Sequence, residues 1–110
     1  MFFKNLIKLF SGKYRLIIIR GESMSPTLKN NQIVWVDYHK DTIKNLKKGD
    51  IVLFKNPFGE NLIVKRVNHY KQQKGYWMKG DNQNIMESSD SEMFGYVKQD
   101  LLRGRICNKK

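Results

Sequence analysis

Short runs of apolar, often β-branched residues recur along the chain, and polar turn residues separate them. Residues 30–31, 56–59 and 72–75 are typical turn sequences, whereas residues 38–48 indicate an exposed connection. The runs favour strands, and they occupy residues 16–19, 32–37, 51–55, 62–69, 76–78 and 105–107. Short strands at close spacing predict an all-β fold, a small coiled sheet or partly open barrel of short antiparallel strands.

Residues 1–12 have a different pattern, with apolar side chains on one side of a predicted helix and lysines on the other. Gly12 is expected to end this short N-terminal helix. About ten residues cannot cross a hydrocarbon core that requires about twenty, so no transmembrane segment is expected. The interleaved lysines argue against a signal peptide. The helix can pack against its own domain or lie on a membrane surface as a peripheral contact.

Composition indicates a single domain of 110 residues, which comprises the helix at 1–12 and a β core at 13–107. The net charge is +11, and no five consecutive residues carry like charges, so we interpret the charged residues mainly as a solvated surface. Cys107 is the only cysteine, which excludes an internal disulfide and favours a reducing, cytoplasmic location. His39 and His69 lack the paired spacing of a metal site, so no metal or other cofactor is expected.

The octet GESMSPTL, from Gly21 to Leu28, follows the first apolar run. The chain is therefore expected to leave the core, turn at Gly21 and present Ser23 at a corner. Pro26 restricts the backbone beside it and braces the corner. A serine near glycine and proline is commonly only a turn or capping residue. The alternative is a nucleophile, which requires a base within reach.

Lys65 is the best candidate for that base among the sixteen lysines. In a strand with a period of two, Ile63 and Val67 share its face, so its amine emerges among apolar side chains. Desolvation disfavours the ammonium form, and a lysine pKa lowered from about 10.4 to about 7 corresponds to roughly 4–5 kcal/mol. A neutral amine could accept the Ser23 proton and return it to the leaving group. His69 shares the face of Lys65 in this pattern and is the next candidate base.

Three segments resemble the sequence boxes of the signal peptidase I family. Ser23-Met24-Ser25-Pro26-Thr27-Leu28 matches the nucleophile box, Ser-Met-x-Pro-Thr-Leu, at each fixed position. Val64-Lys65-Arg66-Val67 resembles the lysine box. A third resemblance is to the family's Gly-Asp-Asn, Ser-x-Asp-Ser box, and it lies in Gly80-Asp81-Asn82 followed by Ser88-Ser89-Asp90-Ser91.

The resemblance implies a serine endopeptidase with a Ser/Lys catalytic dyad that removes an N-terminal leader from a precursor protein. Ser23 would be the nucleophile and Lys65 the general base, with Ser88 hydrogen-bonded to the Lys65 amine. The residues that would support the loop beneath the dyad are Gly80, Asp81, Asn82 and Asp90. Each of these residue types, taken singly, also fits a plain polar loop. The residues beside the nucleophile that are expected to contact substrate are Met24 and Pro26.

The third box departs from the family pattern in two respects. Two extra residues precede Ser88 compared with the usual spacing, so Ser89 or Ser91 could serve in its place. Glu92 stands where the family often has an arginine partner for the aspartate, here Asp90.

Two further departures lie outside that box. Gly21 stands two residues before the nucleophile, where some members have a serine that donates to the oxyanion, so the oxyanion would depend on the Ser23 backbone N–H. We expect this protein to lack the family's membrane anchor and larger inserted domain. A compact chain resembles the small branch of nickel-type superoxide dismutase maturation proteases. The alternative is an ordinary leader peptidase that docks through residues 1–12.

Two other functions are compatible with the residues. A peptidase fold that binds leaders without cutting them would result if the third box were disabled. A small basic β-barrel could instead bind nucleic acid, although we expect none as a partner. Its stacking platforms would be Tyr38, Phe54, Phe58, Tyr70, Tyr76 and Trp77, which fit a hydrophobic core equally well.

Overall fold

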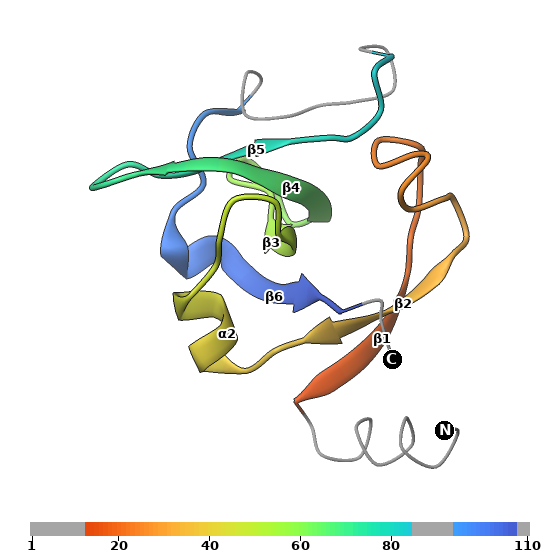
Figure 1. The fold of residues 1–110 in the computed structure, drawn as a ribbon, viewed down its shortest axis with the longest axis horizontal. Coiled ribbons are helices and arrows are strands. Elements are labelled where there is room, and N and C mark those ends of the chain that lie inside the picture. Colours follow the sequence, from red (N-terminus) through yellow and green to blue (C-terminus); the bar gives the residue numbers. More distant parts are fainter. Residues whose placement is uncertain (1–12, 85–93, 108–110) are drawn as a thin grey trace.

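The computed structural model describes residues 13–84 and 94–107, and these form a six-stranded antiparallel sheet (Figure 1). The order across the sheet is β1-β2-β6-β3-β4-β5, so β1 and β5 lie at its two ends. The strands are β1 Tyr14–Ile18, β2 Ile33–Asp37, β3 Ile51–Lys55, β4 Leu62–Lys71, β5 Gly75–Lys79 and β6 Leu102–Ile106. The predicted all-β fold is confirmed, and every apolar run expected to be a strand contributes to one. The helix predicted for residues 1–12 lies outside the described residues.

Within the described residues, the connections between strands contain the short helices α2 Lys40–Lys44 and η2 Gln99–Leu101. The prediction of an exposed connection over residues 38–48 missed α2. Its Ile43 packs against the core, and the Gln99 side-chain amide donates a hydrogen bond of 3.1 Å to the Ile43 carbonyl. These contacts of Ile43 thus hold the helix, which is too short to be stable alone.

The core consists of two clusters of buried side chains, and β3 contributes to both. Leu53 belongs to the first cluster, whereas Val52 and Phe54 belong to the second. Because alternate residues of a strand point to opposite faces, β3 is buried on both sides. The first cluster comprises Ile19, Met24, Leu28, Val34, Val36, Leu53 and Ile106. The second comprises Val52, Phe54, Val67, Tyr76, Met78, Val97 and Leu102.

The first strand is only half buried, which corrects the expectation that the whole run 16–19 lies in the core. Ile19 is 5% exposed and Ile17 packs against the first cluster. Leu16 and Ile18, which alternate with them, are 45% and 49% exposed. Only the face of β1 that carries Ile17 packs against the core, and the face that carries Leu16 and Ile18 is partly exposed.

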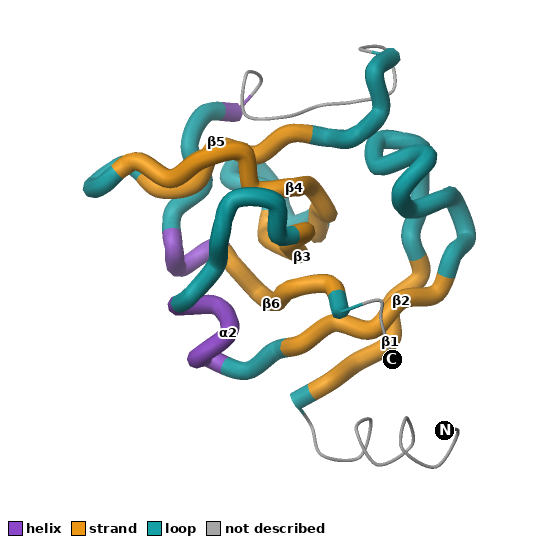
Figure 2. The backbone as a smooth tube through the Cα atoms, in the orientation of Figure 1, coloured by secondary structure: helices purple, strands orange, loops and turns teal. Residues whose placement is uncertain are grey.

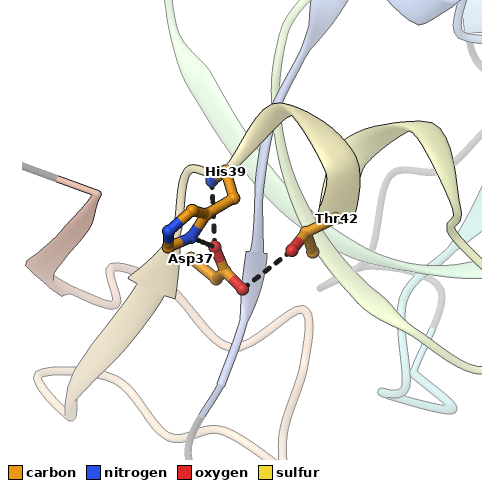
Figure 3. Close-up of polar contacts among 3 residues, drawn as sticks. All are labelled: Asp37, His39 and Thr42. Atoms are coloured by element: carbon orange, nitrogen blue, oxygen red, sulfur yellow. Dashed lines mark hydrogen bonds and ion pairs between the residues drawn. The ribbon is translucent and has the colours of Figure 1, made fainter.

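Asp37 fixes the junction between β2 and α2. The carboxylate is 6% exposed and accepts hydrogen bonds from the His39 backbone N–H at 2.9 Å and the Thr42 hydroxyl at 2.9 Å (Figure 3). The His39 Nδ1 lies 2.6 Å from the same carboxylate. Burial raises the pKa of Asp37, but the hydrogen bonds from His39 and Thr42 outweigh it and hold the pKa below the ordinary value.

Replacing the Asp37 carboxylate should remove a contribution to the free energy of unfolding that is lost at acid pH. Since the pKa of Asp37 is lowered in the folded state, its contribution is present above the unfolded pKa of about 3.9 and is lost as the pH falls through the folded value. Asp37→Asn should lower the free energy of unfolding at neutral pH by roughly 1–3 kcal/mol and flatten its dependence on acid. Urea titrations over a pH series measure both effects, with the exposed Asp100→Asn as control. Equal acid dependence in the two variants would contradict the assignment.

Candidate active site

A groove of about 460 Å³ contains both residues that the sequence proposed as a dyad. Ser23 and Lys65 both line it, from the corner after β1 and from β4 respectively. Most of the other lining side chains are apolar, namely Ile17, Ile18, Ile19, Met24, Leu53, Leu62, Ile63 and Val64. The structure therefore brings together two segments that are far apart in the sequence.

The serine corner is held by its own backbone and by the core. Gly21 has φ of +93°, a conformation that favours glycine, and its N–H donates to the Asn30 side chain at 2.8 Å. The Leu28 N–H donates to the Met24 carbonyl at 2.9 Å, and both side chains are buried in the first core cluster. Among the described residues, no backbone carbonyl accepts a hydrogen bond from the Ser23 N–H.

Lys65 is buried in the middle of β4, as its apolar neighbours predicted. It is 2% exposed and pairs across the sheet with Val52, a fully buried residue of β3. Val67, two residues further along β4, is also 2% exposed. A lysine amine in such surroundings has lost most of its hydration.

His69 does not share the face of Lys65, which corrects the sequence-based expectation. The pairing register between β4 and β5 shifts after Val67, where Val67 opposes Met78 and His69 opposes Trp77. A bulge of this kind inserts one residue and ends the two-residue alternation. Because Met78 and Trp77 point to opposite faces of β5, their partners do so too. His69 stacks on Trp77 and is not among the residues that line the groove.

Asn82 joins the third sequence box to the serine corner. Its backbone N–H donates to the Ser23 carbonyl at 2.9 Å, and its side-chain amide donates to the Glu22 carbonyl at 2.8 Å. In Figure 2 the loop after β5 accordingly lies beside the loop between β1 and β2. Asn82 thus restrains the peptide groups on both sides of Ser23. The other residues predicted for this box, Ser88 and Asp90, lie outside the described residues.

Arg66 and Asp81 connect the lysine box to the third box. The guanidinium donates to both carboxylate oxygens, at 2.8 Å through Nε and 2.6 Å through Nη2, and to the Gly49 carbonyl at 2.7 Å. The Arg66 hydrogen bonds lower the pKa of Asp81 against the opposing effect of burial, and a side-chain hydrogen bond from Thr27 lowers it further. Sequence reasoning gave Arg66 no role of its own. The sequence signal for this ion pair was the presence of Arg66 next to Lys65 and of Asp81 next to Asn82.

Breaking this ion pair should loosen the attachment of the third box. Asp81→Asn removes the charge that Arg66 binds, and we expect a loss of about 1–2 kcal/mol in the free energy of unfolding, since the pair is partly exposed. The Asp81 contribution should also disappear in wild type as the pH falls through its lowered pKa. Thermal and urea unfolding measure the loss, with Asp100→Asn as control. A variant as stable as the control would show that the pair does not hold the loop.

The two residues predicted to contact substrate occupy different places. Met24 lines the groove that contains Ser23, although it is only 2% exposed. Pro26 lines a second cavity of about 430 Å³, together with Thr27, Arg66, Gly80 and Asp81. Gly80 therefore lies close to the ion pair of Arg66 and Asp81 and to the part of the serine corner that contains Pro26 and Thr27.

Two of the six aromatic residues considered as stacking platforms are core residues. Phe54 is fully buried and Tyr76 is 6% exposed, whereas Phe58 and Tyr70 are 79% and 56% exposed. Within residues 13–84 and 94–107, no three acidic, histidine or cysteine side chains lie close enough to hold a metal ion. No helix in this part of the chain is long and apolar enough to span a bilayer.

Comparison with known proteins assigns the family. The sequence model of signal peptidase, peptidase S26, matches residues 6–69, which is more than half of the chain and includes Ser23 and Lys65. The chain belongs to this family. The third box lies beyond the matched range, so its assignment depends on the motif and on the Asn82 and Asp81 contacts.

Curated relatives of this signal peptidase family member are mitochondrial inner membrane protease subunits. Subunit 1 from Xenopus tropicalis is 32% identical over 112 residues, which cover 84% of this chain and 66% of that protein. Subunit 1 from Homo sapiens is 26% identical over 114 residues, which cover 86% of this chain and 68% of that protein. The chain thus spans about two thirds of the length of these relatives.

Proposed function

We propose that the protein is a serine endopeptidase that removes an N-terminal leader from a precursor protein, with Ser23 as nucleophile and Lys65 as general base. The observation that carries the proposal is that both side chains line one groove in a chain of the signal peptidase family. The burial of Lys65 and the bond from Asn82 to the Ser23 carbonyl support it.

In the proposed reaction, the neutral Lys65 amine takes the proton from the Ser23 hydroxyl, whose oxygen attacks the scissile carbonyl. The oxyanion that forms accepts a hydrogen bond from the Ser23 N–H. Lys65 then returns the proton to the leaving amine, and an acyl-enzyme remains. A water activated by Lys65 hydrolyses this ester and frees Ser23.

The groove is suited to an extended peptide. One wall is the end strand β1 with Ile17–Ile19, and the other is the start of β4 with Leu62–Val64. An extended segment beside an end strand can add main-chain hydrogen bonds, while the aliphatic walls bind its side chains. We propose this position for the residues that precede the cut. Aliphatic walls favour a leader whose final residues are apolar and uncharged.

Two kinds of precursor are proposed. The names of the relatives, subunits of an inner membrane protease, favour a leader peptidase that meets its substrate at a membrane surface and has a partner subunit. The second proposal is a nickel-type superoxide dismutase maturation protease, which would release the leader of a soluble precursor.

Mass spectrometry of the new N-terminus distinguishes these proposals. The protein is incubated with a precursor carrying an apolar leader and, separately, with a nickel-type superoxide dismutase precursor. We expect one new N-terminus from one of the two, and none with Ser23→Ala. Leader binding without cleavage would show a non-cleaving relative. Salt-sensitive oligonucleotide binding that survives Ser23→Ala, with no cleavage, would instead favour the nucleic-acid alternative.

A further inference from the structure

Two residues of opposite charge, Arg20 and Glu22, line the groove next to the candidate nucleophile. Together with Lys65 they are the charged residues that line it within the described part of the chain. Arg20 follows the aliphatic wall at Ile19, and Glu22 directly precedes Ser23. A peptide in the groove therefore meets a positive charge near the aliphatic wall and a negative charge beside the nucleophile.

Glu22 is the better placed of the two charges to bind a ligand. It is exposed, and it forms no ion pair with any residue that the structure describes. The Arg20 guanidinium, in contrast, donates a hydrogen bond to the side-chain carbonyl of Asn31. The acid and the base of the groove thus do not neutralise each other, and the carboxylate remains open to a cation from outside.

The backbone of Glu22 is fixed by hydrogen bonds. Its carbonyl accepts from the Asn82 side-chain amide at 2.8 Å and from the Ser25 N–H at 3.0 Å. On the preceding residue, the Gly21 N–H donates to the Asn30 side chain at 2.8 Å. Because this backbone is already ordered, it loses little conformational freedom when the carboxylate binds a partner, and this favours affinity.

We propose that Glu22 recognises a basic side chain on the first or second residue after the cut. This inference rests on the proposed function, which takes the groove as the place of the precursor peptide. A lysine or arginine before the cut would lose hydration between the aliphatic walls without gaining a partner, and Arg20 would repel it. The Cα atoms of Glu22 and Ser23 are about 3.8 Å apart, so the carboxylate is within reach of a long side chain just beyond the cut.

The net charge of the protein predicts the opposite preference. A chain with a net charge of +11 attracts acidic peptides and repels basic ones at long range. A carboxylate in the lining of a groove acts at short range, where salt screens it less than it screens charges further apart. A preference for lysine just after the cut would therefore reveal a nearby carboxylate and not the overall field of the protein.

Binding of uncleaved peptides measures this preference. Fluorescein-labelled peptides have an apolar half, a junction and a hydrophilic half in which the second residue is lysine, glutamine or glutamate. Their affinities for Ser23→Ala protein are measured by fluorescence polarisation. We expect the lysine peptide to bind about tenfold more tightly than the glutamate peptide, because one gains an attraction and the other a repulsion. The same lysine placed two residues before the junction should weaken binding.

Charge reversal at position 22 separates recognition from a structural effect. In Ser23→Ala protein, Glu22→Gln should abolish the preference for the lysine peptide, and Glu22→Lys should make the glutamate peptide bind more tightly. Glu60→Gln is the matched control and should keep the preference, because Glu60 is an exposed glutamate that does not line the groove. In protein with Glu22, a salt concentration of about 0.5 M should reduce the preference.

The outcomes distinguish this inference from the proposed function. A lysine preference that survives Glu22→Gln would overturn the inference, as would tighter binding of the glutamate peptide or no binding of any peptide. Cleavage of the same peptides by protein with Ser23 is measured separately. Cleavage without a charge preference would refute the role of Glu22 and leave the proposed function intact. A preference in binding that depends on Glu22, without any cleavage, would refute the proposed function and leave the recognition site.

Discussion

Lys65→Ala should lower the rate of leader cleavage at neutral pH by at least about 10⁴-fold, because removal of one member of a catalytic dyad abolishes most of the chemistry that the pair performs. No other lysine lines the groove, so none is placed to replace it. Cleavage is measured by mass spectrometry of the precursor, and folding by circular dichroism. Lys71→Ala is the matched control, since Lys71 is an exposed lysine of the same strand.

The pH dependence separates a base from a purely structural lysine. The charged amine cannot accept a proton, so kcat/KM of the wild type should rise with pH until the amine is neutral, and burial places this rise below that of an exposed lysine. Lys65→Arg should be inactive at every pH, because a guanidinium stays charged. Retained turnover of Lys65→Ala at neutral pH would refute the dyad. Because His69 lies on the opposite face of β4, it offers no ready substitute.

Ser23→Ala should also abolish cleavage while the protein keeps its fold and still binds the leader. The loss is again expected to be at least about 10⁴-fold, since no acyl-enzyme can form without the hydroxyl. Ser23 is partly exposed in the lining of the groove, so removal of its hydroxyl should change the unfolding temperature little. Binding of a labelled leader peptide, measured by fluorescence polarisation, should persist.

Ser25→Ala is the control for this serine, because it lies two residues away in the same corner. It should retain cleavage close to the wild-type rate. Loss of activity in Ser25→Ala but not in Ser23→Ala would move the nucleophile within the corner. An equal loss in both variants with a lowered unfolding temperature would indicate that the corner had been disrupted and that the hydroxyl had not been tested.

Several features of the fold could be predicted from local pattern alone. Strands β3, β4 and β5 follow from apolar runs between turn sequences, since alternating or continuous apolar residues need a sheet to bury them. Helix α2 could not be predicted from its five residues, because a helix of that length forms only through tertiary contacts such as that of Ile43 with the core. The exposure of Leu16 and Ile18 was likewise hidden, since residue type does not reveal that only one face of β1 packs against the core.

The amino-acid sequence by itself determined which residues are chemically capable. It identified Ser23 on a braced corner, Lys65 between two apolar positions of a strand, and the Gly80-Asp81-Asn82 segment, because motif and periodicity are local properties. Only the tertiary structure decided which of these groups meet. Sheet order places β1 and β4 on two sides of one groove, Asn82 reaches the peptide before Ser23, and a bulge turns His69 away. Such contacts join residues distant in the chain, and the register that creates them depends on the packing of the whole core.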